Sequence, residues 1–212
     1  LYLFSIQSHG QAPILPSIWE SIAAGANAED ALDAAYPFAT NLPNFAVANV
    51  NDRKYLTLLY SDLMPGFPEG GRFAALRGSF DVVDQLNADM SNDIEPPAQP
   101  LSSAYMLFTF GFDQLSYNPF NKIVFDNPLA NNPDIRILVF TRRAGNSSWS
   151  EPEDWSSIPK RTYCRQEVEN NQITGLYFVV TNTGRTASAT SDRIKMTMSP
   201  SSCFGWTGTV RT

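Results

Sequence analysis

Apolar side chains in the first hundred residues recur at the spacing of a helix. The first such group follows Ser17 and Glu20, which form the S-x-x-E pattern of a capping box, where the serine side chain marks the first residue of a helix. The group comprises Ile18, Trp19, Ile22 and Ala23. The pattern predicts a helix that begins at Ser17 and ends before Gly25.

Two further helices are predicted downstream. Asn27 is a good cap for a helix that Pro37 must stop. Asn41 is a cap for a third helix, with Pro43 in its first turn and an end near Asn51. Residues 54–60 are ambiguous between helix and strand, and residues 61–95 read as loop with at most one short helix or strand, because prolines and glycines interrupt them.

The pattern changes to period two after residue 100. Runs rich in Val, Ile, Thr and aromatic residues alternate with polar turns, which is typical of strands in antiparallel sheets. The predicted strands lie near residues 106–110, 122–125, 135–141, 161–164, 173–181, 194–198 and 206–210. About seven strands in this length predict an antiparallel β-sandwich, so the whole chain is expected to be α+β.

A proline-rich stretch at residues 95–100 separates these two textures. Residues 1–100 carry 12 acids and 4 bases, whereas residues 101–212 carry 9 acids and 11 bases. The sequence predicts a helical region over 1–95 that belongs to a larger domain, a linker at 96–100 and a β-sandwich domain over 101–212. Because short helices are marginal without packing, the helical region is expected to dock against the sandwich, a neighbouring subunit or an upstream segment.

Composition narrows the class of protein further. The chain has 212 residues, of which 43% are hydrophobic, and its net charge is −6. The hydrophobic fraction argues against a disordered chain, and the net charge argues against a nucleic-acid partner. No uninterrupted apolar run approaches the ~20 residues that a membrane span needs. Lysine is scarce and Asn, Ser and Thr are abundant, which favours an extracellular or cell-surface location. Leu1 lies in an apolar stretch without the features of a signal peptide, so we expect a fragment of a larger secreted or surface protein.

The two cysteines, Cys164 and Cys203, fit no metal motif. Each is close to the end of a predicted strand, and in a secreted β domain one disulfide between them is the natural pairing. Closing a loop of about 40 residues would stabilise the fold by about 4 kcal/mol. The alternative is a pair of buried free thiols.

The only histidine, His9, restricts the catalytic chemistry. A two-histidine zinc site within the chain is excluded, and no nucleophile elbow or phosphate-binding glycine loop accompanies it. His9 is interpreted as a loop or surface residue. The acidic residues Glu29, Asp30 and Asp33 are interpreted as the start of a helix and its solvated face. We expect no catalytic residue and no cofactor in this chain.

Two oxygen-rich loops could bind a ligand. The first holds Trp149, Glu151, Glu153, Asp154 and Trp155, and it is a calcium loop, an aromatic platform for a glycan, or a proline turn whose tryptophans cover the edge of the sandwich. The second runs from Asp126 to Asp134 and lacks the spacing of an EF-hand. Asn146 begins a glycosylation sequon in an expected turn.

Several segments of the chain together resemble secreted bacterial zinc metallopeptidases of the HExxH type. In the helical part they are 2–4, 18–21, 31–35 and 45–49, similar to the helices that follow the active site in that family. In the β part they are 149–155, 163–165, 179–182 and 203–208, similar to the appended C-terminal sandwich. The HExxH motif, which supplies two zinc ligands and the general base, is absent, so no catalytic residue is carried over.

Two functions follow as hypotheses. The first is a non-catalytic extracellular structural or binding module, whose partners are the upstream part of its own chain, other subunits or a glycan. The second is the C-terminal part of a secreted zinc metallopeptidase whose zinc and active site lie upstream of residue 1.

Overall fold

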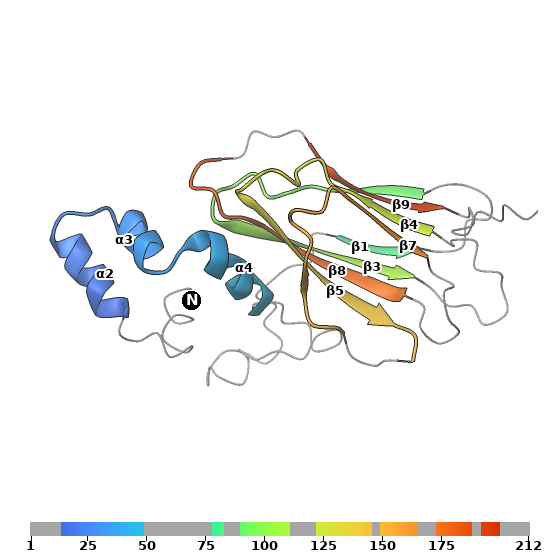
Figure 1. Ribbon diagram of the computed structural model, residues 1–212, viewed down its shortest axis with the longest axis horizontal. Helices are drawn as coiled ribbons and strands as arrows, with labels where there is room; N and C mark the ends of the chain where they lie inside the picture. Colours follow the sequence, from blue (N-terminus) through green and yellow to red (C-terminus); the bar gives the residue numbers. More distant parts are fainter. Residues whose placement is uncertain are drawn as a thin grey trace, which may run out of the picture.

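Figure 1 shows the computed structural model of the chain, which describes residues 14–48, 78–82, 90–110, 122–145, 149–164, 173–187 and 192–199. Within these ranges the chain forms three helices, α2 (Ile14–Ala23), α3 (Ala28–Ala35) and α4 (Phe38–Ala48), and nine strands in two sheets. The described part is therefore α+β and mostly β, as predicted. None of its helices is long and apolar enough to cross a membrane.

Helix α2 begins three residues earlier than the capping box predicted. Pro16 lies in the first turn of the helix, where its missing N–H costs nothing. The Ser17 hydroxyl donates to the carbonyl oxygen of Ile14 (2.7 Å) and does not cap the helix, so the predicted start was wrong. The predicted end is confirmed: Gly25 has a positive φ of 99°, which a glycine adopts without strain, and its N–H donates to the Ile22 carbonyl (2.9 Å).

Helices α3 and α4 follow each other with a single break. Asn27 caps α3 as predicted, accepting from the backbone N–H of Glu29 (2.8 Å). Helix α4 begins at Phe38 and not at Asn41, because the Asp33 carboxylate accepts a hydrogen bond from the Phe38 N–H (2.7 Å). Asp33 therefore acts as a cap for the next helix and is not only part of a solvated face.

The strands form one sheet of five and one of four. The five-stranded sheet has the order β1 (Gly78–Val82), β3 (Ser102–Phe110), β8 (Ile173–Asn182), β5 (Ile135–Arg143) and β6 (Glu153–Asp154). The four-stranded sheet has the order β2 (Met90–Ile94), β9 (Ile194–Ser199), β4 (Lys122–Asp126) and β7 (Lys160–Cys164). All pairs are antiparallel except β1 with β3.

Two of these strands precede the proline-rich stretch, which corrects the predicted division of the chain. Strand β1 pairs with β3, and β2 pairs with β9, so both sheets include residues from the range 61–95. The expectation of at most one strand in that range and of a β region that starts at residue 101 was wrong. The predicted segments 54–60 and 206–210 lie outside the described residues.

A hydrophobic core lies between the two sheets. Phe178 of β8 stacks on Phe125 of β4 with ring centroids 6.0 Å apart, which joins the centres of the two sheets. The same cluster includes residues of both sheets. The five-stranded sheet contributes Met106, Phe108, Ile137, Val139 and Leu176, and the four-stranded sheet contributes Ile94, Ile123, Met196 and Met198. Contact between these inward side chains holds the sheets together.

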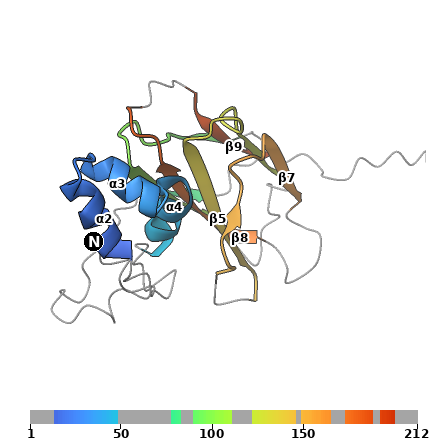
Figure 2. The same ribbon diagram turned by 60° about the vertical axis from the view of Figure 1, so that its left-hand side comes forward.

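A second core covers the outer face of the five-stranded sheet. Helix α4 lies there, and Ala46 packs in one cluster with the outward side chains Tyr105, Leu107, Phe140, Tyr177 and Val179 (Figure 2). The buried Tyr105 hydroxyl donates to the Ala46 carbonyl oxygen (3.1 Å). The predicted docking of the helical region on the sheets is therefore seen for α4.

The proline-rich stretch is fastened to the end of the five-stranded sheet. The buried side-chain amide of Asn182 donates to the carbonyl oxygens of Pro97 and Gln99, both at 3.1 Å, and its own oxygen accepts from the Gly184 N–H (2.9 Å). A side chain at Gly184 would approach the Asp134 carboxylate to 3.0 Å, so glycine suits this crowded turn. Residues 97–99 thus belong to the folded body and do not form a free connector.

Candidate functional site

The loop with two tryptophans separates them onto opposite faces of the five-stranded sheet. Trp155 is fully buried between the sheets, with its ring 5.0 Å from that of Phe125 and stacked at 5.5 Å on that of Tyr163. The backbone N–H of Trp155 donates to the carbonyl oxygen of Ile137 (2.8 Å), which fixes the loop against β5. A buried ring has no free face for a sugar, so Trp155 closes the core between the edges of the two sheets.

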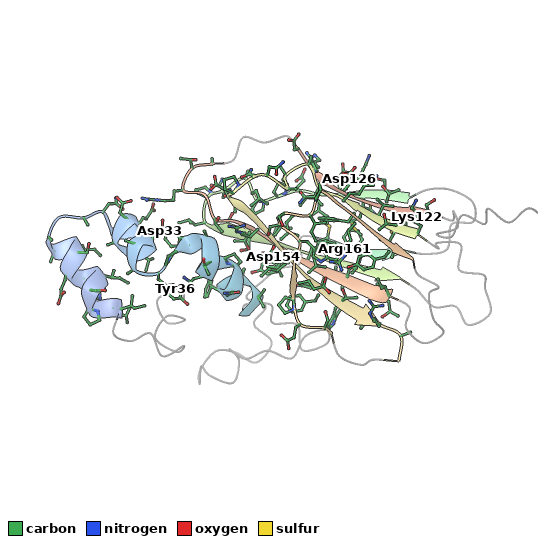
Figure 3. The ribbon with its side chains drawn as sticks, viewed as in Figure 1. Asp33, Tyr36, Lys122, Asp126, Asp154 and Arg161 are labelled. Atoms are coloured by element: carbon green, nitrogen blue, oxygen red, sulfur yellow. The ribbon has the colours of Figure 1, made fainter. Side chains whose placement is uncertain are left out.

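The carboxylates beside Trp155 are engaged in local contacts. Glu153 accepts hydrogen bonds from the Trp155 indole N–H (3.1 Å) and from Arg161 (2.7 Å). These bonds, the indole bond first, lower the pKa of Glu153, although partial burial opposes them. Asp154 accepts from the backbone N–H of Ser156 (2.8 Å) and from its hydroxyl. Both carboxylates therefore hold the loop. Figure 3 labels Asp154, which lies on β6, and Arg161, which lies on β7.

The other two residues of this loop differ in exposure. Trp149 is half-buried in the outer cluster under α4, edge-on to Tyr177 (6.1 Å), with the Arg142 guanidinium 5.2 Å from the centre of its ring. Glu151 is exposed. The loop thus matches the interpretation as a structural turn, with the difference that only Trp155 lies at the edge between the sheets.

The loop from Asp126 to Asp134 is organised by its asparagines. The buried Asn127 donates to the carbonyl oxygens of Ser156 (3.2 Å) and Ile158 (3.3 Å), and it accepts from the Leu129 N–H (3.0 Å). These bonds tie two loops together, so Asn127 has a structural role in this loop. Within the described ranges, no three His, Cys, Asp or Glu side chains gather into a metal-binding group.

Some of the other predicted positions lie outside the described residues, and the rest have structural contacts. His9, Asn146 and Cys203 lie outside the described ranges. Cys164 is the last residue of β7, and its backbone is opposite Lys122 of β4. Glu29 and Asp30, at the start of α3, form ion pairs with Arg185, which follows β8.

The outer face of the four-stranded sheet carries a feature that the sequence did not reveal. One row of residues runs across all four strands: Asp93 of β2, Lys195 of β9, Asp126 of β4 and Lys160 of β7. All four side chains are exposed, and their charges alternate. We call this set the charged row. Figure 3 labels Asp126 and Lys122 at the two ends of β4, far from Asp33 on α3 and from Tyr36, which follows α3.

A pocket opens along the charged row, three of whose four members contribute to its lining. Its volume is about 350 Å³, and its lining comprises Asp93, Asp126, Pro128, Asp192, Arg193 and Lys195. Arg193 also forms an ion pair with Glu95, at the end of β2. The lining mixes both signs of charge around a proline, so the pocket suits a polar group and not an apolar one.

The signal for this surface in the sequence is the alternation in residues 194–198, where Lys195 and Thr197 separate buried residues. The pattern predicts a half-exposed strand, but it does not show which strands pair with it. The pairing brings together residues distant in sequence, and it places three of the chain's four lysines, Lys122, Lys160 and Lys195, on one sheet. Comparison of the chain with protein-family models and with curated proteins found no match.

Proposed function

We propose that the chain is a non-catalytic structural or binding module of a secreted or cell-surface protein, built on a β-sandwich. The two sheets with a shared core support the sandwich architecture. Few lysines and many small polar residues support the extracellular location. The face with the exposed charged row, over which no helix of the described residues lies, is the observation that carries the proposal, because α4 covers the corresponding face of the other sheet.

Within the described ranges, the titratable groups with shifted pKa values support a structural role. Burial raises the pKa of Tyr105 to about 12, and burial also raises the pKa of Tyr163. Tyr105 ties α4 to β3, Tyr163 stacks on Trp155, and Glu153 holds the Trp155 loop. Active sites gather groups with shifted pKa values in a cleft, whereas these three lie at packing contacts of the fold.

A hydrolysis assay tests the non-catalytic part of this proposal. The purified chain is incubated with an unfolded protein substrate, with and without added Zn²⁺ or Ca²⁺, and the products are identified by mass spectrometry. We expect no cleavage above that of a heat-unfolded sample of the same preparation, which controls for contaminating proteases. Metal-dependent cleavage by the folded chain would contradict the proposal.

A second candidate function is the C-terminal part of a secreted zinc metallopeptidase, with the zinc site in a preceding segment. The observation that favours it is Trp19 on α2, whose side chain is 62% exposed. An exposed tryptophan on a short helix suits a contact with another domain, since large aromatic side chains are enriched at the buried centres of interfaces. The resemblance of the helices and the β part to that family supports the same idea.

The parent gene distinguishes the two functions. An HExxH helix encoded within about a hundred residues before Leu1 would favour the metallopeptidase, because that motif carries two zinc ligands and the base. An upstream region without this motif would favour the function as a binding module. The Trp19→Ala variant adds a test on the protein itself. If Trp19 contacts an upstream domain, the substitution should weaken binding of that domain and leave the free energy of unfolding of the isolated chain unchanged.

A further inference from the structure

The order of the charges in the charged row makes the row complementary to its own reverse. From β2 to β7 the charges read negative, positive, negative, positive, on strands that lie side by side. Reversing the order of the row therefore exchanges every negative charge for a positive one. A surface with this property is complementary to a second copy of itself, if the copy is turned so that the order of its strands is reversed.

A two-fold axis that lies between the faces and runs along the strands produces that arrangement. It places Asp93 of one copy opposite Lys160 of the other, and Lys195 opposite Asp126. The interface is isologous, so each of these two contacts occurs twice. A two-fold axis across the strands would instead place Asp93 on Asp93 and Lys195 on Lys195, which like charges disfavour. The row thus selects one of the two face-to-face arrangements.

The four side chains are available for such contacts. Every member is exposed, and among these four described residues no ion pair forms within the chain. The neighbouring row of the same face consists of the small side chains Ser91, Thr197, Val124 and Thr162, which leave room for a facing sheet. Sheets packed face to face lie about 10 Å apart, a distance that a facing Lys and Asp can span.

The size of the face sets the expected strength. Four strands of about five residues cover roughly 300 Å² per copy, at strand spacings of about 4.8 Å and 3.3 Å per residue. Standard interfaces bury about 800 Å² per partner, so the association must be weak. It must also depend on salt, because the Debye length falls from about 10 Å at 0.1 M to about 3 Å at 1 M salt.

We propose that the charged row is a self-association surface, on which a second copy of this chain docks face to face with Asp93 against Lys160 and Asp126 against Lys195. The inference rests on the proposed role as a structural or binding module and names the partner of that same face. The partner is a second copy, because complementarity to itself is the property that the row shows. Such a two-fold contact is closed, so it would join two copies into a dimer.

Zero-length cross-linking tests the pairing directly. A mixture of unlabelled and isotope-labelled chain, at about 0.1–1 mM and low salt as a weak interface requires, is treated with a carbodiimide, which joins a carboxylate to a nearby amine. Mixed-isotope peptides that link Asp126 to Lys195 and Asp93 to Lys160 are expected, and they should disappear at 1 M salt. Links between copies that involve other residues would overturn the proposal.

Charge reversal provides a second test that does not depend on cross-linking. By sedimentation, K195D and D126K should each associate with themselves about tenfold more weakly than the unaltered chain, because like charges then meet twice in the interface. A mixture of K195D with D126K should associate again, since each reversed residue meets its opposite charge on the other chain. In the double variant K195D/D126K the two charges are exchanged, so each still meets an opposite charge on the second copy. This variant should therefore also self-associate.

The matched control is K122E, which changes the sign of a lysine on the same face but outside the charged row. It should leave association within about twofold, because the proposed arrangement places Lys122 opposite Ser199 of the second copy, which carries no charge. Circular dichroism confirms that each variant is folded. A chain that stays monomeric to 1 mM at low salt, or a mixture that fails to associate, would overturn the self-association surface but not the non-catalytic role, which the hydrolysis assay tests separately.

Discussion

The outer faces of the two sheets show how one fold treats its surfaces in opposite ways. On the five-stranded sheet, Tyr105, Leu107, Tyr177 and Val179 point outward and are almost fully buried under α4. On the four-stranded sheet, the outward positions hold the charged row and a row of Ser, Thr and Val, without a helix of the described residues over them. The second face of a sheet is therefore apolar where another layer covers it and polar where water or a partner does.

This difference is visible in the burial along single strands. Strand β8 is buried at nine of its ten positions, because both of its faces lie against other layers. Strand β9 alternates between buried Ile194, Met196 and Met198 and the more exposed residues between them. A continuous apolar run thus indicates a strand with cover on both sides, whatever the direction of its neighbours.

The largest effect that we expect concerns a covalent link at the edge of the four-stranded sheet, over whose outer face no helix of the described residues lies. Cys164 ends the edge strand β7 opposite Lys122, and Lys122 is also opposite Ser199 of β9. Two strand spacings separate Cys164 from Ser199 by about 10 Å, and the four residues from Ser199 to Cys203 can span about 13 Å. The register therefore allows the predicted Cys164–Cys203 disulfide, which would tie the edge of this sheet to the chain that follows β9.

Replacing both cysteines by alanine should lower the free energy of unfolding by about 4 kcal/mol, through the loop of about 40 residues that the bridge closes. Chemical denaturation of the variant and of the unaltered chain, with and without reductant, measures this. The intact mass under native conditions serves as control. Two thiols that react with an alkylating agent in the native protein would show that the uncovered sheet is stable without a covalent link.

The next effect compares apolar residues on the two outer faces directly. Leu107→Ala removes a side chain that is 2% exposed beneath α4, and it should lower the free energy of unfolding by about 3 kcal/mol. Val124→Ala, on an internal strand of the uncovered face, should lower it by less than about 1 kcal/mol, because half-exposed groups are removed from water only in part. Equal losses in thermal or chemical unfolding would mean that both outer faces are covered in solution.

Much of the β region could be predicted from the sequence because its strands are long and apolar. Strands β3, β5 and β8 were found by their runs, whereas β1 and β2 were missed. The segment Met90–Ile94 contains Ser91, Asn92 and Asp93, and only Ile94 among its described side chains is buried, so no apolar period marks it. An edge strand of this kind is recognised only from its partner β9.

The starts of the helices were misplaced for a local reason. Pro16 was taken to lie before the helix, although proline fits the first turn. Asn41 was taken as a cap, although Asp33 had already capped α4 from five residues before Phe38. In both cases a good cap residue was present in the sequence but did not mark the start of the helix, and for α4 the Asp33 carboxylate took that role.

The candidate site could not be predicted, because pairing creates it. Asp93 and Lys160 are ordinary surface charges in the sequence, and only the order of the strands aligns them. The Trp149 and Trp155 loop attracted the functional interpretation because tryptophans and carboxylates are concentrated there. In the structure, Trp155 is buried and both Glu153 and Asp154 are hydrogen-bonded, so the same composition serves packing.

A smaller effect tests the covered face through one hydrogen bond. Tyr105→Phe removes the donor to Ala46 and should lower the free energy of unfolding by about 1 kcal/mol at neutral pH. Burial raises the pKa of Tyr105 to about 12 in the folded chain. The stabilising contribution is therefore complete below the unfolded pKa of about 10 and is lost as the pH rises toward the folded value. Denaturation at several alkaline pH values should show a steeper loss for the unaltered chain than for the variant, and parallel profiles would place Tyr105 in water.

The smallest effect concerns how the remaining helices are held. Arg185 contacts Glu29 at 3.9 Å and Asp30 more closely, and its side chain is 40% exposed, so it joins α3 to the sheets through solvated ion pairs. Arg185→Ala should lower the free energy of unfolding by less than about 1 kcal/mol, and the loss should vanish at 1 M salt. A double-mutant cycle with Asp30→Ala isolates the pair, with Arg193→Ala as a control on an ion pair that does not involve the helices. A coupling well above 1 kcal/mol that persists in salt would show that α3 is held as firmly as α4. In that case α3 as well as α4 would be held firmly against the five-stranded sheet. The contrast between the outer faces of the two sheets would then be greater than the packing of α4 alone indicates.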